Sequence, residues 1–144
     1  MSTSTIRFRN YVSVLYRFGS VFMDRKLKES GISPGHYGCI MEINESPGIT
    51  QEHLGAILRV DKANISRVIH RLAELKMIKI EAASGDKRRQ NLFLTDKGKK
   101  TIPSIRKALA DWSRAISKNI TGKEFNSIVR TLEIMASNAE RVVE

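Results

Sequence analysis

The order of apolar and polar residues predicts a chain built mostly of helices. Gly31, Pro47-Gly48 and Thr121-Gly122 interrupt the apolar pattern where helices are expected to end. Between these breaks, apolar side chains recur at the spacing of an amphipathic helix over residues 8–28, 34–46, 51–59, 61–76, 102–120 and 125–142.

Residues that cap helices stand before several of these stretches. Ser33 precedes Pro34, which suits a first helical position because its missing N–H costs nothing there. Thr50, Asp61 and Thr95 are placed to cap later helices. Since only about two or three residues separate the third helix from the fourth, we predict a sharp helix-turn-helix.

The apolar pattern changes to a period of two after the fourth helix. Apolar residues alternate in two short stretches, residues 78–82 and 92–94. Between them, residues 84–86 read Ser-Gly-Asp and residues 87–89 are all basic. The pattern predicts a β-hairpin with a basic tip. The expected fold class is therefore mainly α with a small β-hairpin, a winged helix-turn-helix.

The last two helical stretches, residues 102–120 and 125–142, are longer than a small winged core can cover. Their apolar residues step by three and four, a near-heptad pattern that suits packing against other helices. Packing within one chain is the alternative, but we favour a subunit interface. We thus expect one domain over residues 1–144, with dimerisation helices at 1–32 and 100–144 and the winged helix-turn-helix region at 33–99.

Charge narrows the choice of partner. Lys and Arg number 25 and Asp and Glu 15, a net charge of +10, and residues 61–101 alone carry +6. This excess points first to nucleic acid and second to an acidic membrane, although an unevenly charged solvated surface is the plain alternative. The chain shows neither a secretory signal nor an apolar run of the ~20 residues that span a bilayer, so we expect a cytoplasmic protein without membrane contact.

The helix after Asp61 carries polar residues on the face opposite its apolar stripe. In a helix-turn-helix, the N-terminal part of this helix points into the major groove. Arg and Lys read guanine, and Asn reads adenine. We therefore predict DNA contacts from Lys62, Asn64, Ser66, Arg67 and Arg71.

The basic hairpin tip is the second expected contact. Lys87, Arg88 and Arg89 cannot all be buried, because unpaired charge in a core is too costly. A projecting hairpin reaches an adjacent minor groove, whose negative potential attracts Arg. Asp86 either braces the Arg88 guanidinium or starts the turn, and the sequence leaves both open.

These residues carry a family resemblance. The segment Val60-Asp61-Lys62-Ala63-Asn64-Ile65-Ser66-Arg67 resembles the recognition helix of the multiple-antibiotic-resistance regulator (MarR) family. Asp86-Lys87-Arg88, followed by Leu92-Phe93-Leu94-Thr95-Asp96-Lys97-Gly98, resembles that family's wing signature, Asp-x-Arg and then Leu-Thr-x-x-Gly. The order of helices also agrees, so the resemblance covers essentially the whole chain.

The resemblance implies a homodimeric transcription factor that binds a pseudo-palindromic double-stranded operator. By this resemblance Arg88 enters the minor groove, and Lys87 and Arg89 lie near phosphates. Many members are repressors, released by small aromatic acids, other ligands or cysteine oxidation. Repression and activation are both compatible with the residues themselves.

Two positions depart from the family pattern. Lys76 occupies the slot after the recognition helix that is usually Gly, where a left-handed backbone costs a non-Gly residue about 1 kcal/mol. The helix end is therefore expected to differ. Ile80 replaces an Arg that is common in the first wing strand, which makes the base of the wing more apolar.

Other candidate residues are interpreted as structural. The single cysteine, Cys39, lies beside an apolar stripe and is expected in the core. The three histidines show no ligand spacing, so we expect no metal site and no cofactor. Aromatic residues are either core or lining of an effector pocket: Tyr11, Tyr16, Phe22 and Trp112.

Two other classes of function are weighed against a sequence-specific regulator. A winged-helix protein that binds nucleic acid without sequence preference, or that acts as an adaptor, is the second interpretation. No nucleophile–base pair, phosphate-binding Gly-rich loop or paired carboxylates indicate catalysis, so we expect no enzyme.

Overall fold

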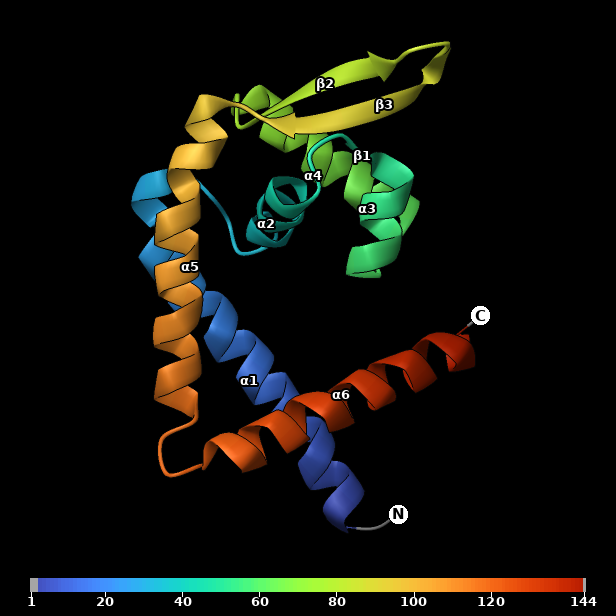
Figure 1. The fold of residues 1–144 in the computed structure, drawn as a ribbon. Coiled ribbons are helices and arrows are strands. Elements are labelled where there is room, and N and C mark those ends of the chain that lie inside the picture. The colour runs from blue at the N-terminus through green and yellow to red at the C-terminus, as the bar shows by residue number, and fades with distance from the viewer. Residues whose placement is uncertain (1–2, 144) are drawn as a thin grey trace. The chain divides into compact units, whose positions relative to one another are not determined.

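The protein is mainly helical, with one small antiparallel sheet (Figure 1). The computed structural model describes residues 3–143. These form two compact units, one ending at Leu109 and one beginning at Ala110. The elements are α1 (Thr3–Leu27), a 3-10 turn η1 (Lys28–Ser30), α2 (Tyr37–Glu45), β1 (Ile49–Thr50), α3 (Gln51–Leu58), α4 (Lys62–Glu74), β2 (Ile78–Ala83), β3 (Asp86–Leu94), α5 (Asp96–Ile116) and α6 (Gly122–Val143).

The predicted helix-turn-helix is confirmed as α3 and α4. The Thr50 hydroxyl accepts the His53 N–H at 3.2 Å and caps α3. The Asp61 carboxylate accepts the Asn64 N–H at 2.9 Å and caps α4. Arg59, with φ 53°, reverses the chain between them in the left-handed conformation.

The start of α2 differs from the prediction. The His36 N–H donates to the Ser33 carbonyl at 2.9 Å, which closes a turn over residues 33–36. The first α-helical bond then runs from the Ile40 N–H to the His36 carbonyl at 3.2 Å. The Ser33-Pro34 cap is therefore wrong, because the turn delays the helix until Tyr37.

The sheet has the strand order β1-β3-β2, with β3 in the centre. β1 was missed in the sequence because two residues are too few to show alternation. In β3, Leu92 lies between Ile49 of β1 and Ile80 of β2 and is fully buried. Ile80 lies on β2, an edge strand of this sheet, and is 37% exposed.

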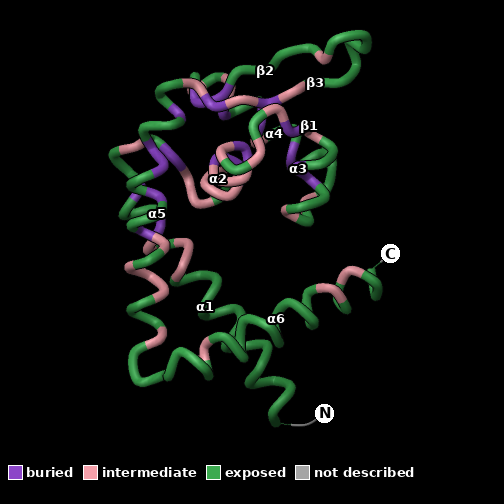
Figure 2. The backbone as a smooth tube through the Cα atoms, in the orientation of Figure 1, coloured by how far each residue is buried: buried purple, intermediate pink, exposed green. Residues whose placement is uncertain are grey.

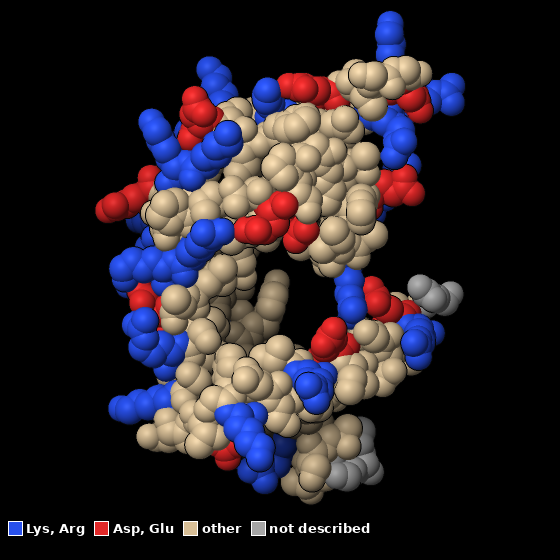
Figure 3. All heavy atoms as spheres, in the orientation of Figure 1, with Lys and Arg blue, Asp and Glu red and all other residues tan. Residues whose placement is uncertain are grey.

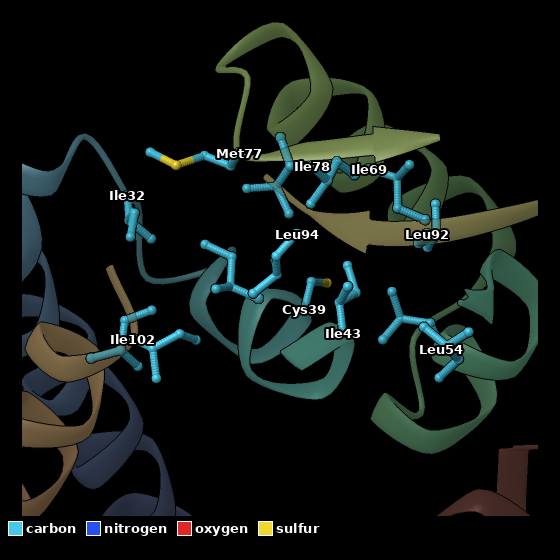
Figure 4. Close-up of a cluster of buried hydrophobic side chains, with 14 of the residues drawn as sticks. Ile32, Cys39, Ile43, Leu54, Ile69, Met77, Ile78, Leu92, Leu94 and Ile102 are labelled. Carbon is cyan, nitrogen blue, oxygen red and sulfur yellow. The ribbon is translucent and has the colours of Figure 1, made fainter. Parts of the chain in front are cut away.

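The buried core lies among the end of α1, helices α2, α3 and α4, the sheet and the first part of α5 (Figure 2). In Figure 4, Ile78, Leu92 and Leu94 of the hairpin point toward Cys39 and Ile43 of α2. Ile57 of α3 was expected in the apolar stripe but is 43% exposed, although Leu54, three residues earlier, is fully buried. Within residues 3–143, no helix is both long and apolar enough to cross a membrane.

The end of α4 is bonded directly to the start of α5. Lys76 adopts φ 58°, so the chain keeps the left-handed turn despite lacking Gly, and the expected change of helix end is wrong. Side chains from Thr95 and Lys97 compensate: the Thr95 hydroxyl donates to the Lys76 carbonyl at 2.6 Å, and Lys97 Nζ donates to the Leu75 carbonyl at 2.8 Å. These bonds satisfy carbonyls that the helix end leaves open.

The second unit, from Ala110, contains the end of α5 and the whole of α6. Thr121 and Glu124 form a capping box: the Thr121 N–H donates to Glu124 Oε2 at 2.8 Å, and the Glu124 N–H to the Thr121 hydroxyl at 3.3 Å. The Thr121 hydroxyl also donates to Glu124 Oε2 at 2.7 Å, and this bond, followed by the one from the Thr121 N–H, lowers the pKa of Glu124. Within α6, no residue through Val143 is buried.

Replacing Gly98 with Ala should lower the free energy of unfolding. A Cβ on Gly98 would lie 2.1 Å from the Met77 carbonyl oxygen, so the α4–α5 junction would have to open. We expect a loss of at least about 2 kcal/mol in the free energy of unfolding, measured by urea denaturation.

Gly122→Ala is the matched control, because a Cβ there meets nothing within 4 Å. It should leave stability unchanged or raise it slightly. Equal stability of Gly98→Ala and Gly122→Ala would show that the junction does not need the close approach between Gly98 and the Met77 carbonyl.

Candidate nucleic-acid interface

Helix α4 has a buried face and an exposed face, as the sequence predicts. Ile65, Ile69 and Leu72 are at most 2% exposed and hold the helix on the core. The predicted contact residues of its first two turns are all exposed: Lys62, Asn64, Ser66 and Arg67. The polar side chains that were expected to meet DNA therefore lie together in solvent.

A chain of hydrogen bonds links three side chains along this exposed face. Asn64 donates through Nδ2 to the second carboxylate oxygen of Asp61, and Arg67 donates through Nη2 to Asn64 Oδ1. The pKa of Asp61 is lowered, mainly by the hydrogen bonds from the Asn64 backbone and side chain and in part by the positive charge of Arg67. Sequence reasoning assigned Asp61 to the cap alone, although the three-residue spacing of residues 61, 64 and 67 contains the signal.

Arg71 lies on the same helix but interacts with residues outside this chain of hydrogen bonds. Its guanidinium pairs with Glu74 at 3.0 Å, one helical turn further on. It also faces His36, whose pKa is lowered first by burial and second by the charge of Arg71. The structure thus does not bring Arg71 into the hydrogen-bonded group of Asp61, Asn64 and Arg67.

The hairpin places its basic residues on a strand rather than on the loop. The turn itself is Ser84-Gly85, with Gly85 at φ 90°, and Lys87, Arg88 and Arg89 belong to β3. Because Ala82 pairs with Gln90 and Ala83 with Asp86, residues 87–89 bulge out of the described ladder. The predicted hairpin with a basic tip is confirmed, with its basic residues in the bulged start of β3 beside the two-residue turn.

The bulge leaves all three basic side chains exposed, and Lys and Arg side chains gather around this end of the hairpin (Figure 3). Asp86 Oδ1 accepts the backbone N–H of Arg88 at 2.9 Å. Of the two roles left open for Asp86, the structure therefore shows the turn-forming one. The Arg88 backbone is held while its side chain extends into solvent.

The single cysteine lies in the core. Cys39 is 3% exposed, and burial raises the pKa of its thiol to about 11, which confirms it as a core residue. Among residues 3–143, no three His, Cys, Asp or Glu side chains are close enough to hold a metal ion.

The buried thiol makes a direct prediction about reactivity. Because a thiol with a pKa of about 11 is almost fully protonated at neutral pH, Cys39 should react with an aromatic disulfide reagent far more slowly in the folded protein than in urea. Reaction is followed by the absorbance of the released thiolate. Equal rates in the two states would contradict a buried, inert thiol.

The second helix of the helix-turn-helix has an exposed polar face, and a basic hairpin lies beside it. These features define a winged-helix DNA-binding protein. Comparison with known proteins makes this more specific. Residues 30–89 match the model of the MarR family. An HTH-type transcriptional regulator of Bacillus subtilis, YybA, is 29% identical over 116 residues, which cover 81% of this chain and 77% of that protein.

Solved structures agree over nearly the full length. A MarR transcriptional regulator from Methanosarcina mazei has 29% identity and a TM-score of 0.82, covering 94% of this chain and 97% of that one. A MarR variant from E. coli, complexed with operator DNA, has the same fold at 19% identity, with a TM-score of 0.81 over 92% of this chain and 95% of that one. The family resemblance is thus confirmed: the chain is similar to MarR-family transcriptional regulators in the sequence of its winged region and in its fold.

Proposed function

We propose that the protein is a homodimeric repressor that binds a pseudo-palindromic operator and is released by a small-molecule effector. The observation that carries this proposal is the exposed face of α4, where Lys62, Asn64 and Arg67 stand together on a helix whose other face is buried. The family and the relatives are regulators rather than enzymes, which agrees with a binding function.

Each predicted contact residue has a role in this proposal. Lys62, Asn64, Ser66 and Arg67 face base edges in the major groove, and Arg71 lies further along the same helix. Arg88 enters the neighbouring minor groove. Lys87 and Arg89 lie near phosphates, where their charge adds affinity without sequence preference.

Exposed apolar side chains on the terminal helices support a dimer. Large apolar exposures of this kind mark interaction surfaces in proteins that are otherwise well packed. Those of α1 include Phe8, Tyr11, Leu15, Tyr16 and Phe18, and those of α6 include Ile128, Val129, Leu132, Ile134 and Met135. We assign residues 1–32 and 100–144 to dimerisation on this basis.

Release by a ligand is favoured over release by oxidation. Because Cys39 is buried and its pKa is raised to about 11, it lacks the thiolate that oxidants attack. Exposed aromatic residues of α1, Tyr11 and Tyr16, would suit a small aromatic effector. A repressor of this kind acts in the cytoplasm, beside the genes it controls.

Selection from a random duplex pool tests the proposal as a whole. At about 150 mM salt, a symmetric dimer should enrich an inverted repeat whose half-sites are ~34 Å apart or a multiple of that distance. Bound duplexes are sequenced after several rounds. Binding without any enriched sequence would contradict the proposal and favour a nonspecific nucleic-acid binder, and no binding at all would favour an adaptor.

Arg88→Ala tests the wing. Loss of the guanidinium should weaken binding to the selected duplex by about 1–3 kcal/mol and relax the preference for A·T pairs flanking each half-site. Affinity is measured by fluorescence anisotropy on duplexes that differ only at those pairs. Lys118→Ala, which removes the same charge from the segment between α5 and α6, is the control, and an equal effect of the two variants would rule out a minor-groove role for Arg88.

A further inference from the structure

The hydrogen bonds of Asp61 account for more than a helix cap. One carboxylate oxygen accepts the Asn64 backbone N–H at 2.9 Å, which is the capping bond. The other oxygen accepts a hydrogen from the Asn64 side-chain amide. A cap needs only the first of these bonds, so the second has a separate consequence for the Asn64 side chain.

That second bond fixes which way the Asn64 amide faces. Nδ2 is turned toward Asp61, and Oδ1 is left to accept a hydrogen from Nη2 of Arg67. All three side chains lie on the exposed face of α4, so the order Asp61, Asn64, Arg67 runs along the surface expected to meet DNA. The lowered pKa of Asp61 keeps its carboxylate charged at neutral pH, where it acts only as an acceptor.

The remaining hydrogen-bonding capacity matches what base reading needs. An Asn side chain has two N–H donors and two acceptor lone pairs, and the chain of bonds uses one of each. One donor and one acceptor remain, and these are the two kinds of group with which Asn contacts adenine N7 and N6. Arg67 uses one of its five donors and keeps others for guanine O6 and N7.

We propose that Asp61 is a positioning residue for sequence recognition, which holds the Asn64 amide and, through it, the Arg67 guanidinium in the orientation that reads bases. This rests on the proposed function, because it assigns a role within the same interface. Asp61 itself donates nothing to DNA, and its negative charge weakens attraction to phosphates. Asp61 therefore lowers nonspecific affinity for DNA and increases discrimination between sequences.

Two substitutions separate this role from capping. Asp61→Ser and Asp61→Asn both retain an oxygen that caps the helix, because Ser, Asn and Asp are about equally good in that position. Ser has no second acceptor for the Asn64 amide. In Asp61→Asn, the second carboxylate oxygen becomes an NH₂ group that cannot accept from Asn64 Nδ2, so the amide turns and releases Arg67.

The measurement is the ratio of affinities for a duplex selected by the wild type from a random pool of about 30 base pairs and for a scrambled duplex of the same composition. Both variants should lower this ratio by about 5-fold to 10-fold. Their affinity for the scrambled duplex should hold or rise, since a negative charge is gone. Their thermal midpoints should stay close to that of the wild type.

Glu52→Gln is the charge-matched control, because Glu52 lies in the first turn of the neighbouring α3, outside the chain of bonds. It should raise both affinities alike and leave their ratio unchanged. If the wild type prefers the selected duplex and both Asp61 variants show the same affinity ratio as the wild type, the positioning role is overturned. A joint fall of both affinities and the thermal midpoint would overturn it too, since that is the loss of a cap. A wild type without discrimination would overturn the proposed function, and this inference with it.

Discussion

The close approach between the Met77 carbonyl and Gly98 holds the winged region together. It brings Met77, three residues beyond the end of α4, against Gly98 in the first turn of α5, and only a residue without a side chain fits there. Around it, Thr95 joins both segments: its N–H donates to the Met77 carbonyl at 3.0 Å, and its hydroxyl accepts the Gly98 N–H at 3.1 Å. The end of α4, the base of the hairpin and the start of α5 are therefore one structural unit.

This junction explains how the two elements proposed to contact DNA, α4 and the β2–β3 hairpin, are held in a fixed relation to each other. α4 ends at the junction, β2 begins from it, and β3 returns to it through Leu94. Because Ile65, Ile69 and Leu72 are buried in the same core as Leu92, the helix face and the hairpin are both fixed to that core. Sequence reading and backbone contact can then act at a constant separation, which is what an operator of fixed geometry requires.

The sequence predicted most of the fold because local signals were strong. Thr50, Asp61 and Thr95 cap the helices assigned to them, and the period of two located the hairpin. The two errors have different causes. At Ser33 a local turn, closed by the His36 N–H, replaces the expected helix start. At Lys76 tertiary bonds from Thr95 and Lys97 hold the Lys76 and Leu75 carbonyls, and the left-handed backbone is kept without Gly. At the interface, the sequence identified the exposed residues but not the hydrogen bonds between them. Those bonds depend on side-chain conformations, which a sequence pattern does not specify.

The most direct test of base reading by α4 is a double-mutant cycle between Asn64 and adenine N7. Affinity is measured for the wild type and Asn64→Ala on the selected duplex and on duplexes in which single adenines are replaced by 7-deazaadenine. At one adenine in each half-site, the two changes should be non-additive by about 1 kcal/mol or more, since each removes the same hydrogen bond. Additive losses at every adenine would show that Asn64 does not read bases, and would contradict the assignment of α4 as the recognition helix.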